Sequence, residues 1–362
     1  MVGLVDGAVF RHESSLAGWM TGWVRHFVTL IFWRRMTTWV LALGALGACG
    51  PPSAYHHYRG EAMGTQVALT YAGCAGDVAA AVAHELQQVD TQLSTWRPDS
   101  EAARFNASAV GDWFPVSAPV AALAIEALAL SRRSGGAFDL TVAPLVQLWG
   151  FGSEAPANGS APSSEAVAAA MRRVGWRNLE ARPDPPALRK RLAGLSLDFS
   201  AIGKGHGVDR VAERLEGLGC HSYLVDIGGE VRTLGLGPKG GSWRIGVKQP
   251  DGGAPRWILR LSGQSAATSG DYRNFRMLDG RRLSHAIDPR AGQPVSHALA
   301  SVTVVAARAA QADGLATAIQ VLGPNAGWRF AQDERAAALL LVRGESGFEH
   351  RYTESMSQFL QP

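Results

Sequence analysis

The sequence contains little lysine and little cysteine. Only four of its 35 basic residues are lysines, and the formal charge of the 362 residues is +4. That charge is too small for the basic surface of a nucleic-acid-binding protein, so we expect no nucleic-acid partner. The three cysteines include no C-x-x-C pair, and no second histidine follows His84 at helical spacing, so the sequence gives a zinc site no support. With 46% hydrophobic and 18% charged residues, the composition is that of an ordinary folded protein.

Long hydrophobic runs are also scarce. The apolar stretch at 37–48 is too short to span a bilayer comfortably. It follows Arg34-Arg35 and leads to Leu-Gly-Ala-Cys49, which is the order of parts in a lipoprotein signal peptide. We therefore expect residues 1–48 to be a signal region and Cys49 to carry a lipid.

This interpretation places the rest of the protein in the bacterial cell envelope, held at a membrane by its lipid. Residues 49–59 become a lipidated linker, and the remainder faces the periplasm. A transmembrane anchor that includes the apolar residues 27–33 is the alternative, and Met36 is a second candidate start. An oxidising compartment allows a disulfide between Cys74 and Cys220, although the sequence does not show whether they lie close together.

Hydrophobic spacing predicts a fold of the α+β class. Helical spacing begins after Asp77 and again after Ser117, which predicts two helices in the first half of the chain. Strand-like patterns are found at residues 66–71, 195–199 and 257–261.

The second half of the chain favours antiparallel sheet. Asp-Gly at 279–280 separates two strand-like runs and predicts a hairpin. Only two clear helices, at about 205–218 and 312–322, interrupt the strands, and so few crossovers argue against a parallel β/α barrel. We expect mainly antiparallel sheets with flanking helices in one catalytic domain, residues 60–345, followed by a C-terminal tail at 346–362.

One glycine-rich segment places a lysine near the start of a predicted helix. From Asp198 to Asp209 the sequence reads DFSAIGKGHGVD, which predicts a strand end, a glycine loop and a helix. Backbone N–H groups at a helix start, together with Lys204, favour an anion such as a phosphate or pyrophosphate. The alternative is a plain strand-to-helix turn with Asp209 on an exposed helix face. The segment is no nucleotide P-loop, because Asp198 replaces its first glycine and Gly205 its Ser or Thr.

Three further positions carry groups suited to catalysis or binding. Asp313 and Thr317 lie four residues apart on a predicted helix, so they share a face opposite its apolar residues and offer two hard oxygens to Mg²⁺. In the alternative, Asp313 is an N-cap and Thr317 a surface residue. His285 precedes an Asp-Pro turn and suits a general base, although a lone histidine is more often structural. Trp96 either stacks on a flat ring or attaches its helix to the core.

Taken together, these segments resemble the ApbE family of FAD:protein FMN transferases, many of which are exported lipoproteins. The similarity runs from about Gly60 to Gly323, with the matching segments in the family's order. They are Met63–Thr65, Leu93–Trp96, Gly136–Asp139, Asp198–Asp209, Asp226–Glu230, Thr268–Tyr272, Ser284–Pro289 and Ala312–Gly314. Each is weak alone, and their ordered occurrence makes the resemblance specific.

The resemblance implies roles for individual residues. It implies FAD contacts at eight positions: Met63, Trp96, Ala137, Phe138, Asp139, Asp198, Lys204 and Ile287. It implies four Mg²⁺ ligands: the side chains of Asp313 and Thr317 and the backbone carbonyls of Ala201 and Ala316. His285 becomes the general base. Two positions depart from the family pattern, because His206 stands where an aromatic residue is usual and Ala286 where a β-branched one is.

The function that follows is the transfer of FMN from FAD to a target flavoprotein, such as a redox-complex subunit. A Thr or Ser hydroxyl of the target attacks the FMN-side phosphorus, AMP leaves, and FMN stays on the target through a phosphoester. Mg²⁺ neutralises the phosphate charge and His285 accepts the hydroxyl proton. Two alternatives stay open: an FAD pyrophosphatase, in which water replaces the target hydroxyl, and an exported FAD carrier, which needs neither His285 nor the metal.

Overall fold

The centre of the fold is an eight-stranded antiparallel sheet with the strand order β18-β17-β16-β11-β8-β7-β3-β2. The structure is a computed structural model that describes residues 2–3, 54–152, 161–272, 275–278, 281–345 and 347–361. The strands of this sheet are β2 His56–Ala62, β3 Thr65–Ala72, β7 Ser222–Ile227, β8 Glu230–Leu234, β11 Ser265–Gly270, β16 Leu299–Ala306, β17 Ala337–Gly344 and β18 Gly347–Tyr352. Because β3 pairs with β7, the sheet joins the two halves of the chain.

Smaller sheets surround the central one. A four-stranded antiparallel sheet consists of β1 Val2–Gly3, β9 Trp243–Val247, β10 Trp257–Leu261 and β19 Leu360–Gln361. A three-stranded sheet consists of β4 Phe114–Pro115, β5 Leu179–Pro183 and β6 Pro186–Lys190. Two hairpins pair β12 Phe275–Leu278 with β13 Arg281–Ser284, and β14 Ile287–Asp288 with β15 Gln293–Pro294.

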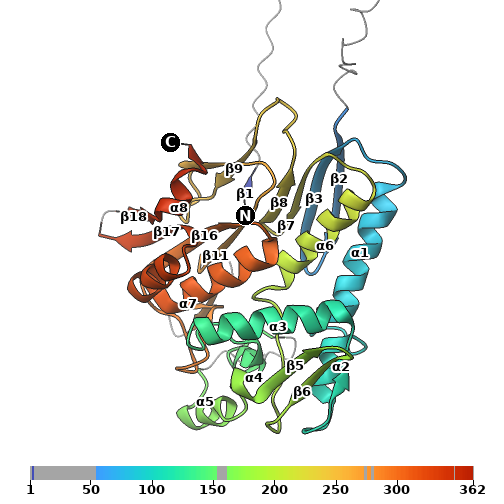
Figure 1. The fold of residues 1–362 in the computed structure, drawn as a ribbon. Helices are drawn as coiled ribbons and strands as arrows, with labels where there is room; N and C mark the ends of the chain where they lie inside the picture. The colour runs from blue at the N-terminus through green and yellow to red at the C-terminus, as the bar shows by residue number, and fades with distance from the viewer. Residues whose placement is uncertain are drawn as a thin grey trace, which may run out of the picture. The chain divides into compact units, whose positions relative to one another are not determined.

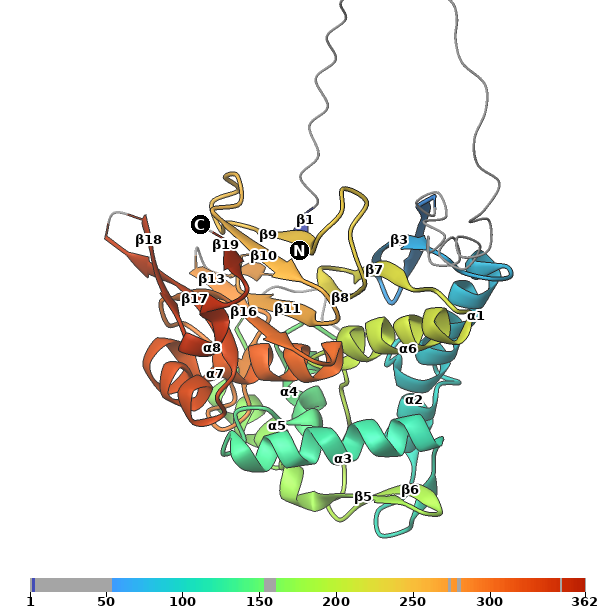
Figure 2. The ribbon, with the colours of Figure 1, turned by 45° about the horizontal axis from the view of Figure 1, so that its top comes forward.

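Helices surround the central sheet, most of them on the side opposite the four-stranded sheet, whereas Met356 of the short last helix packs with the four-stranded sheet. They are α1 Val78–Leu93, α2 Glu101–Ala107, α3 Ala118–Arg133, α4 Ala143–Leu148, α5 Ser164–Met171, α6 Gly203–Gly217, α7 Ala309–Asp333 and α8 Glu354–Ser357, with 3₁₀ turns at Leu140–Val142 and Trp176–Asn178. Figures 1 and 2 show α6 and α7 in line with each other beside the strands, with α3 in the layer beyond them.

The two sides of the sheet follow from side-chain alternation along its strands. Leu339 and Leu341 of β17 pack in a cluster with Leu259 of the four-stranded sheet. Leu340, between them, packs in the cluster that contains Ile319 of α7. Since neighbouring strand residues point to opposite faces, one strand supplies two cores. The helix that carries the candidate metal ligands is therefore held directly against the sheet.

The predicted α+β class with mainly antiparallel sheets is confirmed. The helices predicted after Asp77 and Ser117 are α1 and α3, and the Asp77 side chain caps α1 by accepting a hydrogen bond from the backbone N–H of Ala80 at 3.0 Å. The helix predicted at 205–218 is α6. In the predicted hairpin, Leu278 pairs with Arg281 as a two-residue turn requires, while residues 279–280 lie outside the described part of the chain.

Two element predictions need correction. Residues 195–199 form no strand, although Leu195, Leu197 and Phe199 are all buried. The alternation there comes from an irregular segment inside the core. The helix predicted at 312–322 continues to Asp333, with a break at Gly323, whose φ of 80° lies outside helical geometry.

Cys74 and Cys220 form a disulfide with an S–S distance of 2.00 Å. It joins the segment after β3 to the residue two places before β7, so it fixes the edge half of the sheet near α1. The sequence left this pairing open.

The expected export signal falls almost entirely outside the described residues. Of residues 1–53 only Val2–Gly3 is described, so the signal region at 1–48 and the lipidation site Cys49 stay predictions. Within the described ranges, no helix is both long enough and apolar enough to cross a membrane.

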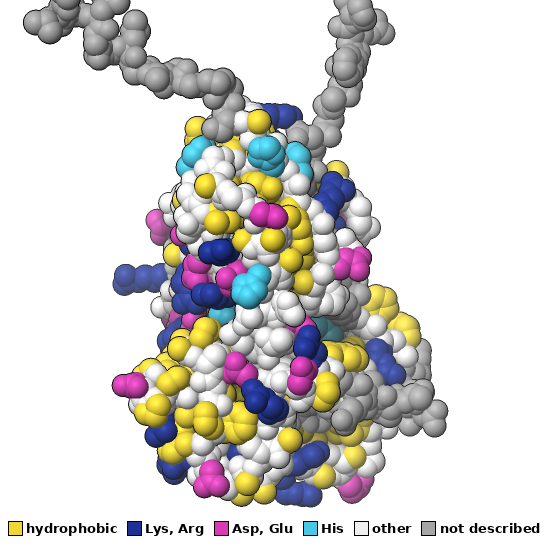
Figure 3. Space-filling model, turned by 90° about the vertical axis from the view of Figure 1, so that its right-hand side faces the viewer, with side chains coloured by type: hydrophobic (Ala, Val, Ile, Leu, Met, Phe, Trp, Pro, Cys, Tyr) yellow, Lys and Arg dark blue, Asp and Glu magenta, His cyan; other side chains and the backbone are white. Residues whose placement is uncertain are grey.

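On the face that Figure 3 shows, Lys and Arg side chains are interspersed with Asp and Glu.

Candidate active site

The start of α6 and the second turn of α7 meet, and candidate metal ligands lie on both sides of this contact. The Asp313 carboxylate is 3% exposed and accepts a hydrogen bond from the backbone N–H of Gly205 at 3.0 Å. The Thr317 hydroxyl donates to the carbonyl oxygen of Ala201 at 3.3 Å. It also lies 3.2 Å from the Ser269 hydroxyl of β11. Ala316, the fourth expected ligand, is buried in the same helical turn.

The chemistry of this group fits Mg²⁺. A carboxylate, a hydroxyl and a carbonyl supply the hard oxygen atoms that Mg²⁺ prefers. Burial raises the pKa of Asp313 to about 7, against the positive charge of Lys204, and the negative charge of Glu230 raises it further. A bound cation would reverse that effect. In the described part of the chain no three His, Cys, Asp or Glu side chains converge, so a metal here would rely on hydroxyl and carbonyl oxygens beside one carboxylate.

The expected location of Asp313 on a polar helix face is wrong. The first half of α7 is buried on nearly all sides, because the helix lies between the central sheet and α3. The N-cap alternative is also wrong, since Arg308 occupies the N-cap position. Asp313 is thus a buried carboxylate at a contact between two helices.

Lys204 lies beside a second buried acid, Glu230, for which the sequence alone predicted no role. Its Nζ atom is 3.5 Å from Oε1 of Glu230. Glu230 is 3% exposed, and its Oε2 atom has no hydrogen-bond partner among the described residues. Gly228 allows this approach, because a Cβ atom there would lie 2.9 Å from the Thr65 hydroxyl and 3.4 Å from Cδ of Lys204. The only signal for Glu230 was its place in the matching segment Asp226–Glu230.

The amides at the start of α6 are partly occupied. Gly203 N–H donates to the carbonyl of Phe199 at 2.7 Å, and Gly205 N–H donates to Asp313. The segment before α6 is irregular, so the predicted strand end is wrong. An anion bound here would therefore interact mainly with the Lys204 side chain, because the N–H groups of Gly203 and Gly205 already donate within the protein.

The turn between β2 and β3 faces this region. Met63 and Gly64 both have positive φ, 53° and 70°, as a two-residue hairpin turn requires. Such a backbone is uncommon for Met and is typical of functional turns. The Met63 side chain packs against the core that α6 shares with β3.

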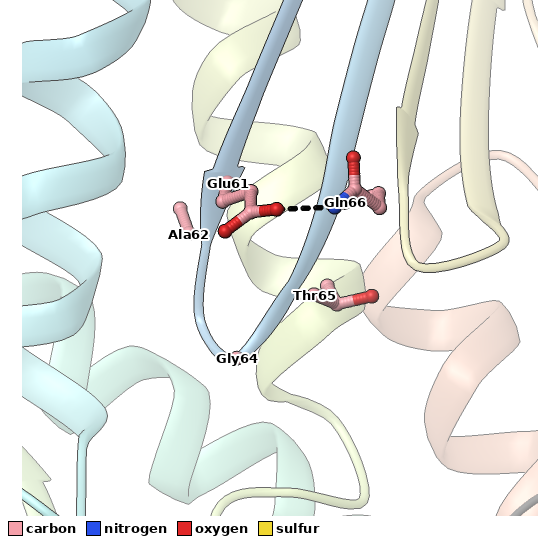
Figure 4. Close-up of a pocket in the computed structure, with 5 residues that line it drawn as sticks. All are labelled: Glu61, Ala62, Gly64, Thr65 and Gln66. Atoms are coloured by element: carbon pink, nitrogen blue, oxygen red, sulfur yellow. Dashed lines mark hydrogen bonds between the residues drawn. The ribbon is translucent and has the colours of Figure 1, made fainter.

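A pocket of about 520 Å³ opens at the same turn (Figure 4). It is lined by Glu61, Ala62, Gly64, Thr65 and Gln66. Figure 4 shows the Gln66 amide donating to the Glu61 carboxylate, with Thr65 closer to the turn. Thr65 also flanks Gly228, so the pocket adjoins Lys204. Gly64 and Thr65 lie in the matching segment Met63–Thr65, whereas Glu61, Ala62 and Gln66 have no sequence pattern beyond that of a hairpin strand.

Trp96 is exposed on the side where α1 ends. Its residue exposure is 70%, so the interpretation that it attaches the helix to the core is wrong. The end of α1 lies at the start of α6, because a Cβ atom at Gly203 would lie 3.7 Å from Cδ1 of Leu93. The indole ring is therefore available to a flat ligand near the start of α6.

The other expected FAD contacts are buried. Ala137 and Phe138 lie in the core. Asp139 accepts bonds from the Thr141 N–H and hydroxyl, both at 2.7 Å, and from the Trp176 N–H at 2.9 Å. Burial raises the pKa of Asp139, while these hydrogen bonds oppose the rise.

Asp198 is connected to the same region. Its N–H donates to the carbonyl of Leu140 at 2.8 Å, and its carboxylate accepts from the Ser200 N–H at 2.7 Å. The Asp198 carboxylate thus shapes the chain just before Ala201, while the Asp139 carboxylate holds the 3₁₀ turns at Thr141 and Trp176. Their contacts with FAD stay predictions.

His285 lies on a segment that packs toward α7. It is half-buried after β13, and the next strand, β14, contacts α7. Ile287 of β14 is buried against Leu145 and Trp149. Asp288 is bound on both carboxylate oxygens by Arg290, at 2.8 and 2.7 Å, so this neighbouring acid already has a cationic partner.

Comparison with known proteins settles the family. The model of the ApbE family matches residues 63–340. The chain belongs to the ApbE family. The FAD:protein FMN transferase of Vibrio cholerae is 36% identical over 335 residues, which are 90% of this chain and 99% of that protein. The enzyme of that name from Escherichia coli K12 is 34% identical over 310 residues, 83% of this chain and 88% of the other.

Solved structures of the family agree with the fold. The flavin transferase ApbE of Vibrio cholerae has a TM-score of 0.79 at 36% identity, covering 85% of this chain and all of that one. The apo form of Pseudomonas stutzeri flavinyl transferase ApbE has a TM-score of 0.77 at 40% identity, covering 85% and 97%. The resemblance drawn from the sequence is therefore confirmed at the level of family and fold.

Proposed function

We propose that the protein is an FAD:protein FMN transferase that uses Mg²⁺ and attaches FMN to a Thr or Ser hydroxyl of a target flavoprotein. The ApbE family and the activity named for its relatives support the reaction. The observation that carries the metal-dependent form is the contact that brings Asp313 and Thr317 of α7 together with Ala201, beside Lys204. Breaking a pyrophosphate bond requires positive charge beside its oxygens, and a bound cation together with Lys204 would supply that charge.

The chain's own residues then have distinct tasks. Lys204 binds the pyrophosphate oxygens, and Glu230 keeps its ammonium group near α7. The exposed Trp96 ring stacks on the flat part of FAD. Mg²⁺ supplies charge neutralisation at the phosphate oxygens when it is bound by the Asp313 group.

His285 holds the proton in the chemical step. The target hydroxyl oxygen bonds to the FMN-side phosphorus, and His285 takes the hydroxyl proton. The bond from that phosphorus to the bridging oxygen breaks, and AMP leaves with this oxygen. The target keeps FMN through a phosphoester, so no redox change occurs.

Flavin retention on a denatured acceptor tests the proposal. The protein is incubated with FAD, Mg²⁺ and an acceptor domain, and flavin is measured on the unfolded acceptor. His285→Asn should lower turnover roughly 10²–10⁴-fold with little change in FAD affinity. Lys204→Ala should weaken FAD binding. Free FMN and AMP without labelled acceptor would instead identify an FAD pyrophosphatase, and tight binding without turnover an FAD carrier.

The envelope location is a separate part of the proposal. The order of Arg34-Arg35, an apolar stretch and Cys49 supports an exported lipoprotein. Mass spectrometry of the mature protein should find a lipidated Cys49 as its first residue. An unprocessed N-terminus upstream of Cys49 contradicts this part without affecting the transferase.

A further inference from the structure

A buried carboxylate on α6 caps the helix that carries the metal ligands. Asp209 is 2% exposed, so the interpretation that it lies on an exposed helix face is wrong. Its Oδ1 atom accepts the backbone N–H of Ala309 at 2.9 Å, and its Oδ2 atom accepts that of Ala310 at 3.0 Å. These are the first two N–H groups of α7, for which the N-cap residue Arg308 has no acceptor. Asp209 therefore caps the N-terminus of α7, although it belongs to α6.

The two helices cap each other. Asp313, in the second turn of α7, accepts the N–H of Gly205 in the first turn of α6. Asp209, in the second turn of α6, accepts the first N–H groups of α7. Gly205 makes the close contact feasible, because a Cβ atom there would lie 2.4 Å from the carbonyl oxygen of Ala309. Each helix thus fixes the start of the other.

Charge holds Asp209 in this position. Arg232 of β8 donates from Nη1 to Oδ1 at 3.0 Å, and Nε of Arg308 lies 3.7 Å from Oδ2. The positive end of the α7 dipole adds to these charges. At the other end of the contact between α6 and α7, Asp313 lies near one positive charge, that of Lys204, and one negative charge, that of Glu230.

We propose that Asp209 is a positioning residue for the Mg²⁺ site, an inference that rests on the proposed function. By fixing the first turn of α7 on α6, it sets where Asp313 and Thr317 stand relative to Ala201. Mg²⁺ demands nearly ideal octahedral geometry at short distances, so a small displacement of α7 should cost affinity. Removing a residue that orients metal ligands without binding the metal itself typically lowers metal affinity 10- to 100-fold.

Cation affinity of an Asp209→Asn variant tests this directly. Asn keeps the size of the side chain but turns an amide N–H toward the N–H groups of α7. Mn²⁺, which takes the same oxygen ligands, is titrated into the FAD-saturated protein and followed by its electron paramagnetic resonance signal. We expect affinity to fall about 10- to 100-fold. At saturating Mn²⁺ the transfer rate should return to within about twofold of wild type, which a general loss of structure would not allow.

Glu216→Gln is the matched control. Glu216 is also on α6 and also pairs with Arg232, at 2.9 Å, but it does not reach the start of α7. Its Mn²⁺ affinity should be that of the wild type. A folded Asp209→Asn protein with wild-type Mn²⁺ affinity overturns the inference. A wild-type protein that binds FAD but no Mn²⁺ refutes the metal-dependent function instead.

Hydrogen exchange on the wild type keeps the inference testable if the variant does not fold. Since coupling between two sites is reciprocal, Mg²⁺ should slow amide exchange in the peptide that contains Ala309 and Ala310. Exchange in β18, far from the contact, should not change. Unchanged exchange at Ala309 and Ala310 with Mg²⁺ bound would also overturn the inference.

Discussion

Replacing His206 with Phe should make the protein less sensitive to acid. His206 lies in the first turns of α6, is 6% exposed, and its Nε2 atom has no hydrogen-bond partner in the described part of the chain. Burial lowers the pKa of the imidazole from 6.5 to about 4, against the charge of Asp209, while Arg210 and Arg308 lower it further. The folded protein therefore keeps this ring neutral at pH values where the unfolded chain protonates it.

The size of the effect follows from this difference. Well above pH 6.5 the His206 ring is neutral in both the folded and the unfolded state, so it does not affect the free energy of unfolding. As the pH falls from 6.5 toward 4, only the unfolded state gains the proton, so the free energy of unfolding decreases. The full loss is about 3 kcal/mol, and about 2 kcal/mol of it is reached at pH 5. Phe keeps an aromatic ring without a titrating group, so the variant should lack this loss.

Urea unfolding at pH 7.5 and pH 5 measures the difference. Between these pH values the wild type should lose about 2 kcal/mol more than His206→Phe. Any packing cost of the larger ring enters equally at both pH values and cancels. His84→Phe makes the same substitution at an exposed position on α1 and serves as the control for the substitution itself. Equal pH dependence in wild type and His206→Phe would refute the reasoning.

Three further changes have defined outcomes. Asp313→Asn keeps the size of the side chain at the α6–α7 contact and removes its charge, so FMN transfer should fall more than about a hundredfold with little change in thermal midpoint; wild-type transfer in limiting Mg²⁺ contradicts the metal role. Lys190→Met removes the buried ammonium that donates to the Asn106 carbonyl at 2.8 Å, while the Phe105 carbonyl keeps its bonds from Ser108, so the variant should cost about 1–3 kcal/mol in urea unfolding. An unchanged midpoint argues against this capping role. Replacing Cys74 and Cys220 with Ser opens a loop spanning 146 residues and should lower the free energy of unfolding by up to about 5 kcal/mol. Dithiothreitol should then have no further effect on the stability of the variant. Stability equal to that of the oxidised wild type would exclude a role for the disulfide.

The spacing of hydrophobic residues correctly predicted the buried face of helices that are half exposed. It did not predict which residues are buried in segments that lie wholly inside the core. Val78, Val82 and Leu86 of α1 face the core while the other side meets solvent, so the helical spacing was visible. In α7 nearly every residue before Gly323 is buried, so the face with Asp313, which the spacing predicted to be polar, is buried as well. The segment 195–199 alternates like a strand because its buried residues alternate, and no strand pairs with it.

The site was predictable where the chemistry is local. Asp313 and Thr317 share one helix, and Lys204 lies in a glycine-rich segment, so each was visible alone or through its motif. Glu230 and Asp209 act through partners on other elements, and neighbouring sequence gives no sign of such contacts. Only the packing of α6 on α7 and β8 makes them part of the site.

The bonds between α6 and α7 join parts of the chain that are made far apart in time. Ala309 and Asp209 are 100 residues apart, and Asp313 and Gly205 are 108. A growing chain that ends between Arg232 and Ala309 carries Asp209 with its Arg232 partner but without the two N–H groups of α7, and a carboxylate with unmet hydrogen bonds is costly to bury. Such a chain should leave α6 loosely packed and its apolar side exposed. Shortened products should therefore be removed by proteases rather than persist as partial enzymes that bind flavin.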